Sequence, residues 1–228
     1  MAEQQVQNRS DIGTRLLQVR EHSLASVAPL SAEDQCLQSM PDASPTKWHL
    51  AHTTWFFETL VLQAHCPGYA PVDGRYAKLF NSYYESLGPR HPRPLRGLLT
   101  RPSLAQVLAW RQTVDNTLQR FIADAPSNTW RLAQPLVELG IHHEQQHQEL
   151  ICTDILHALA QNPLLPAMLG GVEPTVAPAA DGWLARPGGM VDVGHAGSAF
   201  AFDNETPRHT VHLPPYALRN RPAPGHER

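Results

Sequence analysis

Two histidines in segment 141–150 have the spacing of a metal-binding pair. His143 and His147 are four residues apart, so on a helix they lie on one face about one turn apart. Two imidazoles placed in this way can bind a single ion, and neutral imidazole suits zinc, copper, iron and nickel. Leucines at helical spacing share this face, which directs the pair toward the protein interior. The segment therefore predicts a buried metal site.

A second helix has to supply the third ligand. Segment 48–58 offers His49 and His52, and His52 stands among tryptophan and phenylalanine residues that suit an inward position. Glu149 comes two residues after His147, which places it about 200° further round the helix. We therefore predict that Glu149 lies behind the ligands or on the helix surface, not on the metal.

The same motif has competing interpretations. The run from His143 to His147 matches the zinc-protease pattern HExxH, with Glu144 as general base and Asp154 or His157 as a third ligand. A histidine pair on an apolar face is also a common structural feature of a helical core without any metal. The spacing alone leaves these alternatives and the identity of the metal open.

Helical periodicity predicts the elements that position these histidines. Ser10, Pro45 and Ser103 mark helix starts. The expected helices cover residues 10–29, 45–65, 75–87, 103–124 and about 128–160. Four longer helices and one short helix pack most economically as an antiparallel bundle.

The character of the chain changes after residue 162. Proline, glycine and alanine dominate 163–188, and the alternating segments 190–193 and 209–213 predict strands. We place a domain boundary near 165–180. The C-terminal piece is too small to bury a sound core alone.

Composition narrows the function classes. The 228 residues carry a formal net charge of −3, without the basic footprint of a nucleic-acid-binding or membrane-surface protein. Three widely spaced cysteines argue against a disulfide framework and favour a reducing, cytoplasmic compartment. The polar N-terminus lacks the apolar core of a signal peptide, and no apolar run reaches the roughly 18 residues that span a bilayer.

Three separated motifs resemble one known family. They are SMPDASPTKWHLAHTTWFFE, LFNSYYESLGPRHPRPLRGLLTRPS and HHEQQHQEL. In this order they closely resemble the ergothioneine-biosynthesis sulfoxide synthases, also called hercynine oxygenases. The resemblance covers about residues 10–218. It implies a mainly α fold: a DinB-like four-helix bundle over 10–165, followed by the start of an α+β, sulfatase-modifying-factor-like domain over 180–218.

The resemblance also implies the site and the reaction. The family's Fe(II) ligands fall on His52, His143 and His147, and Glu149 matches a glutamate that lies behind them. The implied enzyme is a non-haem iron oxidoreductase. It uses O2 to join the sulfur of γ-glutamylcysteine or cysteine to hercynine, leaving a sulfoxide. Arg90, Arg93 and Arg96, with Arg101 nearby, suit the carboxylates of such a thiol.

This chain departs from the family at its C-terminal end. The family's second domain is much longer and supplies the catalytic tyrosine, so we expect an incomplete second domain and a disordered tail over 219–228. Three alternatives to the synthase remain open at this point. They are a related synthase for selenoneine or for histidine and cysteine, a zinc-dependent DinB-like hydrolase or thiol transferase, and a helical remnant without activity.

Overall fold

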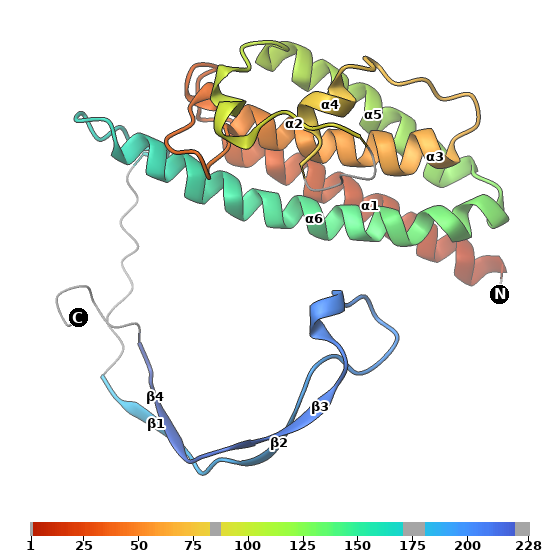
Figure 1. Cartoon of the computed structure of the whole chain (residues 1–228). Coiled ribbons are helices and arrows are strands. Elements are labelled where there is room, and N and C mark those ends of the chain that lie inside the picture. Colours follow the sequence, from red (N-terminus) through yellow and green to blue (C-terminus); the bar gives the residue numbers. More distant parts are fainter. Residues whose placement is uncertain (1, 83–87, 171–180, 222–228) are drawn as a thin grey trace. The chain divides into compact units, whose positions relative to one another are not determined.

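The computed structural model describes residues 2–82, 88–170 and 181–221, with side chains described from Arg9 onward. The chain divides into two compact units, Met1–Gly171 and Val172–Arg228. The first is helical and the second contains short strands (Figure 1). The predicted fold class, a mainly α bundle followed by a small segment with strands, is confirmed.

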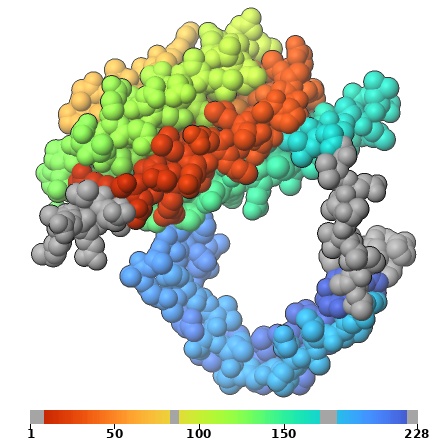
Figure 2. Space-filling view, turned by 180° about the vertical axis from the view of Figure 1, so that it is seen from behind, coloured from red at the N-terminus to blue at the C-terminus, as the bar shows by residue number. Residues whose placement is uncertain are grey.

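Four long helical segments build the first unit. They are α1 (Ala2–Val27), α2 (Thr46–Phe56), α5 (Leu104–Asp124) and α6 (Ser127–Ala160). Both α1 and α2 pack against α5 and α6, which is the arrangement of a four-helix bundle. The space-filling view shows α1 lying between α5 and α6 on one face of this unit (Figure 2).

The ends of these helices follow local chemistry. Ser103 accepts a hydrogen bond from the backbone N–H of Gln106, whose side chain accepts one from the backbone N–H of Ser103. This reciprocal cap fixes the start of α5. Pro45 lies just before α2 instead of at its first helical position, α1 begins at Ala2 and not at Ser10, and α6 begins at Ser127 with Pro135 inside it.

The second predicted helix has a turn that the periodicity did not indicate. After α2 the chain forms a π-helical segment, η2 (Phe57–Leu62), before the short α3 (Gln63–His65). Such insertions into helices are frequent near functional sites.

The short helix predicted over 75–87 is only partly present. The structure contains α4 (Tyr76–Phe80), after which Asn81 adopts an extended backbone and its side chain donates to the carbonyl of Gly88. Residues 83–87 lie outside the described part of the chain. Two 3-10 helices, η1 (Asp34–Cys36) and η4 (Arg93–Leu98), lie in segments expected to be loops.

The core lies around α2, because all eleven residues of this helix are buried. Its neighbours α5 and α6 bury one stripe each, including Trp110, Val114, Val137 and Ile141. A helix covered on every side is positioned by packing from all directions. Within the described residues, no helix is long and apolar enough to cross a membrane.

The second unit consists of paired short strands. β1 (Trp183–Arg186) pairs antiparallel with β4 (Tyr216–Arg219), and β2 (Gly189–Val193) with β3 (His209–Leu213). A 3-10 turn, η5 (Asp203–Glu205), lies between β2 and β3. None of its described side chains is buried, and Trp183 is 69% exposed. This unit therefore has no core of its own among its described residues.

Two features of this unit were not predicted. Strands β1 and β4 are additional to the two expected ones, and Arg219 belongs to β4 rather than to a disordered tail. Asn220 bonds to the backbone of Gly182, and Arg219 and Arg221 pair with Asp181. The ordered structure thus reaches Arg221, and the remainder of the predicted tail, 222–228, lies outside the described residues.

Candidate metal centre

Three histidines from two helices converge in the helical unit. His52 of α2 and His143 and His147 of α6 each offer one nitrogen, and these three nitrogens lie within 4.8 Å of one another. Among the described residues, no carboxylate joins this group. The three side chains that the sequence pointed to therefore come together as the ligand set of a possible metal ion.

Aromatic packing and one glycine set the position of these rings. Trp48 stacks on His52 with ring centroids 4.7 Å apart, and Phe56 packs on His143 at the same centroid distance. Gly140 lies on α6 one turn before His143, and a Cβ there would overlap the ring of Phe57. The absence of a side chain at Gly140 lets α6 approach α2 closely enough for the histidines to meet.

Hydrogen bonding leaves one nitrogen of His52 free for a ligand. Its Nδ1 lies 2.6 Å from the backbone carbonyl oxygen of Phe80, which can only accept. The proton therefore sits on Nδ1, and Nε2 keeps its lone pair. A second-nitrogen contact of this kind is the usual way in which a protein orients a metal-binding imidazole.

His147 is held by a chain of two further residues. Its Nδ1 lies 2.8 Å from Nδ1 of His49, and Nε2 of His49 lies 3.0 Å from a carboxylate oxygen of Asp154. The same oxygen of Asp154 accepts from the backbone N–H of Ser44 at 2.8 Å. We call His49, His52, His143, His147 and Asp154 the histidine cluster.

The protonation states suit a cation. Burial lowers the pKa of His143 to about 4 and lowers the pKa of His52 and His147 well below the ordinary value. Within the described part of the chain, Nδ1 of His143 is buried without a hydrogen-bond partner. A metal binds the neutral form of imidazole, because the ligating nitrogen must carry a lone pair. The donor set therefore fits a metal ion.

Glu144, the glutamate of the HExxH match, belongs to a different cluster. Its carboxylate accepts from Arg20 at 2.9 Å, from Ser23 at 2.6 Å and from Arg111. Arg20 also pairs with Asp115. We call Arg20, Arg111, Asp115 and Glu144 the ion-pair cluster.

The charge of Glu144 is fixed by this cluster. Burial alone would raise its pKa, but the charges and hydrogen bonds of Arg111 and Arg20 outweigh burial and lower the pKa to about 2. A general base must accept a proton near neutral pH. The arrangement therefore gives no support to Glu144 as the base of a zinc hydrolase.

The other candidate residues on α6 lie outside the ligand group. Glu149 is exposed, so its position gives no support to the predicted role behind the ligands. His157 is also exposed, and its Nδ1 lies 2.7 Å from the hydroxyl of Ser39. Asp154 contacts His49 and not the three converging nitrogens.

The predicted arginines line a pocket of about 500 Å³ together with Ser82 and His91. Arg90, Arg93 and Arg96 all contribute to it, whereas Arg101 is exposed and donates to the carbonyl of Thr100. The structure thus brings together the three arginines that the sequence indicated.

This arginine pocket borders the histidine cluster through one ring. The guanidinium of buried Arg96 lies 3.4 Å from the ring centroid of Trp48, which stacks on His52. Arg96 also donates to the hydroxyls of Ser44 and Ser82. Trp48 therefore links Arg96, which lines the cationic pocket, to a candidate metal ligand.

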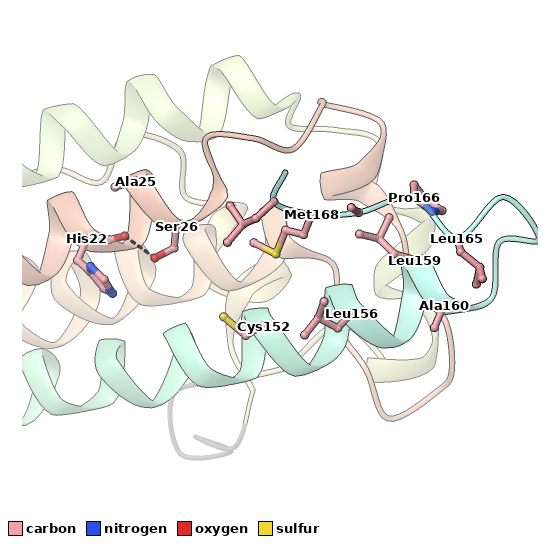
Figure 3. Close-up of a pocket in the computed structure, with 12 residues that line it drawn as sticks. His22, Ala25, Ser26, Cys152, Leu156, Leu159, Ala160, Leu165, Pro166 and Met168 are labelled. Carbon is pink, nitrogen blue, oxygen red and sulfur yellow. Dashed lines mark hydrogen bonds between the residues drawn. The ribbon is translucent and has the colours of Figure 1, made fainter. Parts of the chain in front are cut away.

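A second, apolar pocket of about 840 Å³ lies between α1 and the end of α6. Figure 3 shows Met168 in this pocket, with Cys152 and Leu156 contributed by α6. Its lining contains no member of the histidine cluster.

Sequence reasoning missed how the polar residues are shared between the two clusters. The sequence indicates His49 only as an alternative ligand and gives no signal for Arg20 and Arg111. Asp154 shares the face of His147 two turns along α6, and this spacing was the available signal for its position near the histidines.

Comparison with known proteins identifies the family of the helical unit. A family model described as the DinB superfamily matches residues 15–151, which is more than half of the chain. A search of curated proteins finds no match. The matched residues include all three converging histidines and most of the bundle. The chain therefore belongs to the DinB superfamily.

Proposed function

We propose that this chain is an Fe(II)- and O2-dependent enzyme that forms a carbon–sulfur bond as a sulfoxide. The substrates would be hercynine and an acidic thiol, either γ-glutamylcysteine or cysteine. The observation that carries the proposal is the group of three neutral histidine nitrogens from α2 and α6, which no described carboxylate joins. Bound Fe(II) would supply the redox chemistry that allows O2 to react with a thiol.

The donor set supports a metal that binds a thiol. Three neutral ligands leave the full charge of a divalent ion in place, whereas the commoner arrangement of two histidines and one carboxylate cancels part of it. A thiolate is attracted more strongly by the uncancelled charge. Three protein ligands also leave further coordination positions for substrates.

The arginine pocket supports a thiol that carries carboxylates. Arg90, Arg93 and Arg96 line it, and guanidinium groups bind carboxylates through paired hydrogen bonds. Arg96 and His52 both pack on the ring of Trp48, so a carboxylate bound by these arginines would lie within one ring of the histidine cluster. Arg96 is buried, whereas Arg90 is exposed and Arg93 is half-buried, so Arg90 and Arg93 are our principal candidates for contact with the substrate.

The proposed reaction is balanced without a further reductant. The thiol and the C2–H of the imidazole each lose one hydrogen, a C–S bond forms, and one oxygen atom of O2 is retained on sulfur. The other oxygen leaves as water. The two substrates provide all four electrons that reduce O2.

The free cysteines Cys36, Cys66 and Cys152 are consistent with a reducing, cytoplasmic compartment for such chemistry.

A zinc-dependent thiol transferase is the second candidate, because three histidines are also a zinc ligand set. A zinc hydrolase that uses Glu144 is disfavoured, since both oxygens of this carboxylate are occupied by Arg20, Ser23 and Arg111. Elemental analysis after anaerobic purification distinguishes iron from zinc.

Metal binding is tested by anaerobic Fe(II) titration of the wild type, His143→Ala and His157→Ala. His157 is the matched control, because it is an exposed histidine of the same helix. We expect the wild type and the control to bind one Fe(II) and to gain about 2.7 kcal/mol of stability at 100 times Kd. His143→Ala should lose more than the roughly 10–100-fold in affinity that loss of a supporting residue costs. Equal binding by all three proteins would refute the site.

Turnover is tested by mass spectrometry with hercynine, O2 and each thiol. The expected product has the mass of both substrates plus one oxygen and minus two hydrogens. Arg90→Met and Arg93→Met should raise KM for γ-glutamylcysteine more than for a thiol without carboxylates. Iron-loaded protein that forms no such product from γ-glutamylcysteine, cysteine or a selenium donor would contradict the proposed reaction but leave the metal site standing.

A further inference from the structure

We propose that His49 and Asp154 form a positioning relay that fixes His147 in the tautomer required of a metal ligand. In this relay Asp154 accepts from Nε2–H of His49, and Nδ1 of His49 accepts from Nδ1–H of His147. Nε2 of His147 then keeps its lone pair for the metal. The inference rests on the proposed metal site and adds two residues outside its ligand set.

The direction of each hydrogen bond follows from the carboxylate. Asp154 receives the backbone N–H of Ser44 on the same oxygen that faces His49, so this oxygen acts as an acceptor. An ionised carboxylate has no proton to donate, so Nε2 of His49 must carry one. The second ring nitrogen of neutral His49 has a lone pair. The short contact with Nδ1 of His147, 2.8 Å, then requires the proton on His147.

Burial keeps His49 in this neutral form. His49 is 2% exposed, and the cationic groups of Arg96 and Arg93 lie near it besides the carboxylate of Asp154. Burial of a cation without a full counter-charge is costly, and the bond to Asp154 satisfies one nitrogen without a second proton. A doubly protonated His49 would donate to His147 and leave the wrong nitrogen of His147 free.

The relay also ties together the two ligand-bearing helices. His49 lies one turn before His52 on α2, and Asp154 lies two turns after His147 on α6. Ser44 lies two residues before the start of α2. One carboxylate therefore fixes the start of α2 and, through His49, the ring of a ligand on α6. The described residues form no comparable chain behind the other ligands: His52 bonds to a backbone carbonyl, and no described group bonds to Nδ1 of His143.

This asymmetry has a consequence for the metal. A carboxylate that accepts from the distal nitrogen of a ligand, here through a second imidazole, increases the electron density of that ligand. His147 is thus the strongest donor of the three. Through the relay, the negative charge of Asp154 increases the electron density of His147, although the described ligands themselves are all neutral.

The first test compares Co(II) affinity among His49→Leu, His49→Asn, Asp154→Ala and the control His157→Ala. Loss of a residue behind a metal ligand typically lowers affinity about 10–100-fold, and we expect this for His49→Leu and Asp154→Ala. His49→Asn retains an acceptor near the position of Nδ1 and should recover most of the affinity. The Co(II) absorption bands should shift in the two weak variants. Unchanged affinity and unchanged spectra in both would overturn the relay.

The second test is independent of the metal. Nitrogen-15 NMR of the histidine rings in the metal-free protein should show His147 protonated at Nδ1 and His49 at Nε2, and Asp154→Ala should change this distribution. A wild type with His147 protonated at Nε2 would overturn the relay.

If the wild type shows the expected tautomers but binds no Co(II) or Fe(II), the proposed function fails and the relay stands. If His49→Leu does not fold, Asp154→Ala decides, because Asp154 is only partly buried.

Discussion

His143 and Glu144 follow one another in α6, yet their side chains enter two different buried clusters. His143 joins the histidine cluster, in which three nitrogens converge and one buried nitrogen lacks a partner. Glu144 joins the ion-pair cluster, in which its two oxygens receive three donors from α1 and α5. One helix thus presents an open donor set on one side and a closed set of charges on the other.

The two clusters therefore differ in role: the histidine cluster is suited to binding a ligand, and the ion-pair cluster to stabilising the fold. In the ion-pair cluster the carboxylate of Glu144 pairs with the guanidinium groups of Arg20 and Arg111. A further ligand would have to displace one of these buried partners. In the histidine cluster the rings are neutral, and a bound cation would coordinate the three nitrogens that face one another. Buried polar groups therefore stabilise the fold in one cluster and form a candidate binding site in the other. Their hydrogen-bond partners show which of the two roles applies.

The largest expected effect is acid unfolding, in which protonation charges the histidine cluster and neutralises Glu144 in separate pH ranges. The folded-state pKa of His143 is lowered from 6.5 to about 4, so the unfolded chain binds a proton first and stability falls as the pH drops through this range. The pKa of Glu144 is lowered from 4.5 to about 2, so its contribution is lost between these values. Urea unfolding at stepped pH should show both losses, and His143→Ala should remove part of the first only.

Glu144→Ala is expected to give the largest effect of a single substitution on stability. Removal of this carboxylate leaves buried Arg111 without its ion-pair partner and Arg20 paired with Asp115 alone, and breaking a buried ion pair typically costs about 3–5 kcal/mol. The free energy of unfolding from urea denaturation measures this loss. Metal affinity of the remaining folded protein should change little. A stable variant with weakened Fe(II) binding would show that Glu144 belongs functionally to the histidine cluster.

Gly140→Ala should disturb both clusters at once, by a smaller amount. The added Cβ would push against Phe57 and Phe56, and these rings contact Arg20 and His143 respectively. Overpacking of this kind costs about 1–3 kcal/mol. We expect reduced stability together with weaker Fe(II) binding, measured by thermal unfolding and titration. An unchanged affinity would mean that the histidine cluster tolerates movement of α6.

Glu149→Gln is expected to have the smallest effect, because this side chain is exposed and lies on neither cluster. Surface substitutions away from special features usually change stability by less than about 0.5 kcal/mol. Both Fe(II) affinity and thermal stability should match the wild type. A marked loss of affinity would restore Glu149 to the supporting role that the resemblance implied.

The predictability of the site depends on how local each relationship is. The pair His143 and His147 follows from helical spacing within one segment, and the structure brings His52 to it as the resemblance implied. The contact between His49 and Asp154 joins residues 105 positions apart, and no periodicity encodes it. Only the packing of α2 against α6 determines which histidine of α2 faces the ligands and which faces Asp154.

The literal HExxH match shows the limit of motif reading. The motif correctly places two histidines together, but the orientation of Glu144 depends on Arg20 and Arg111 from two other helices. In the fold, the long helices follow from periodicity and caps, whereas α4 ends early at Asn81 and β1 pairs with β4 across more than thirty residues. Long-range pairing of short strands has little signal in a single sequence.

The complete burial of α2 has a consequence for how this protein tolerates mutation. An amphipathic helix such as α5 accepts changes on its solvent side, so tolerance along it rises and falls every three to four residues. In α2 no position faces solvent, because all eleven residues from Thr46 to Phe56 are buried. A substitution scan across this segment should therefore be uniformly unfavourable, and the helix that carries His52 would evolve more slowly than its neighbours.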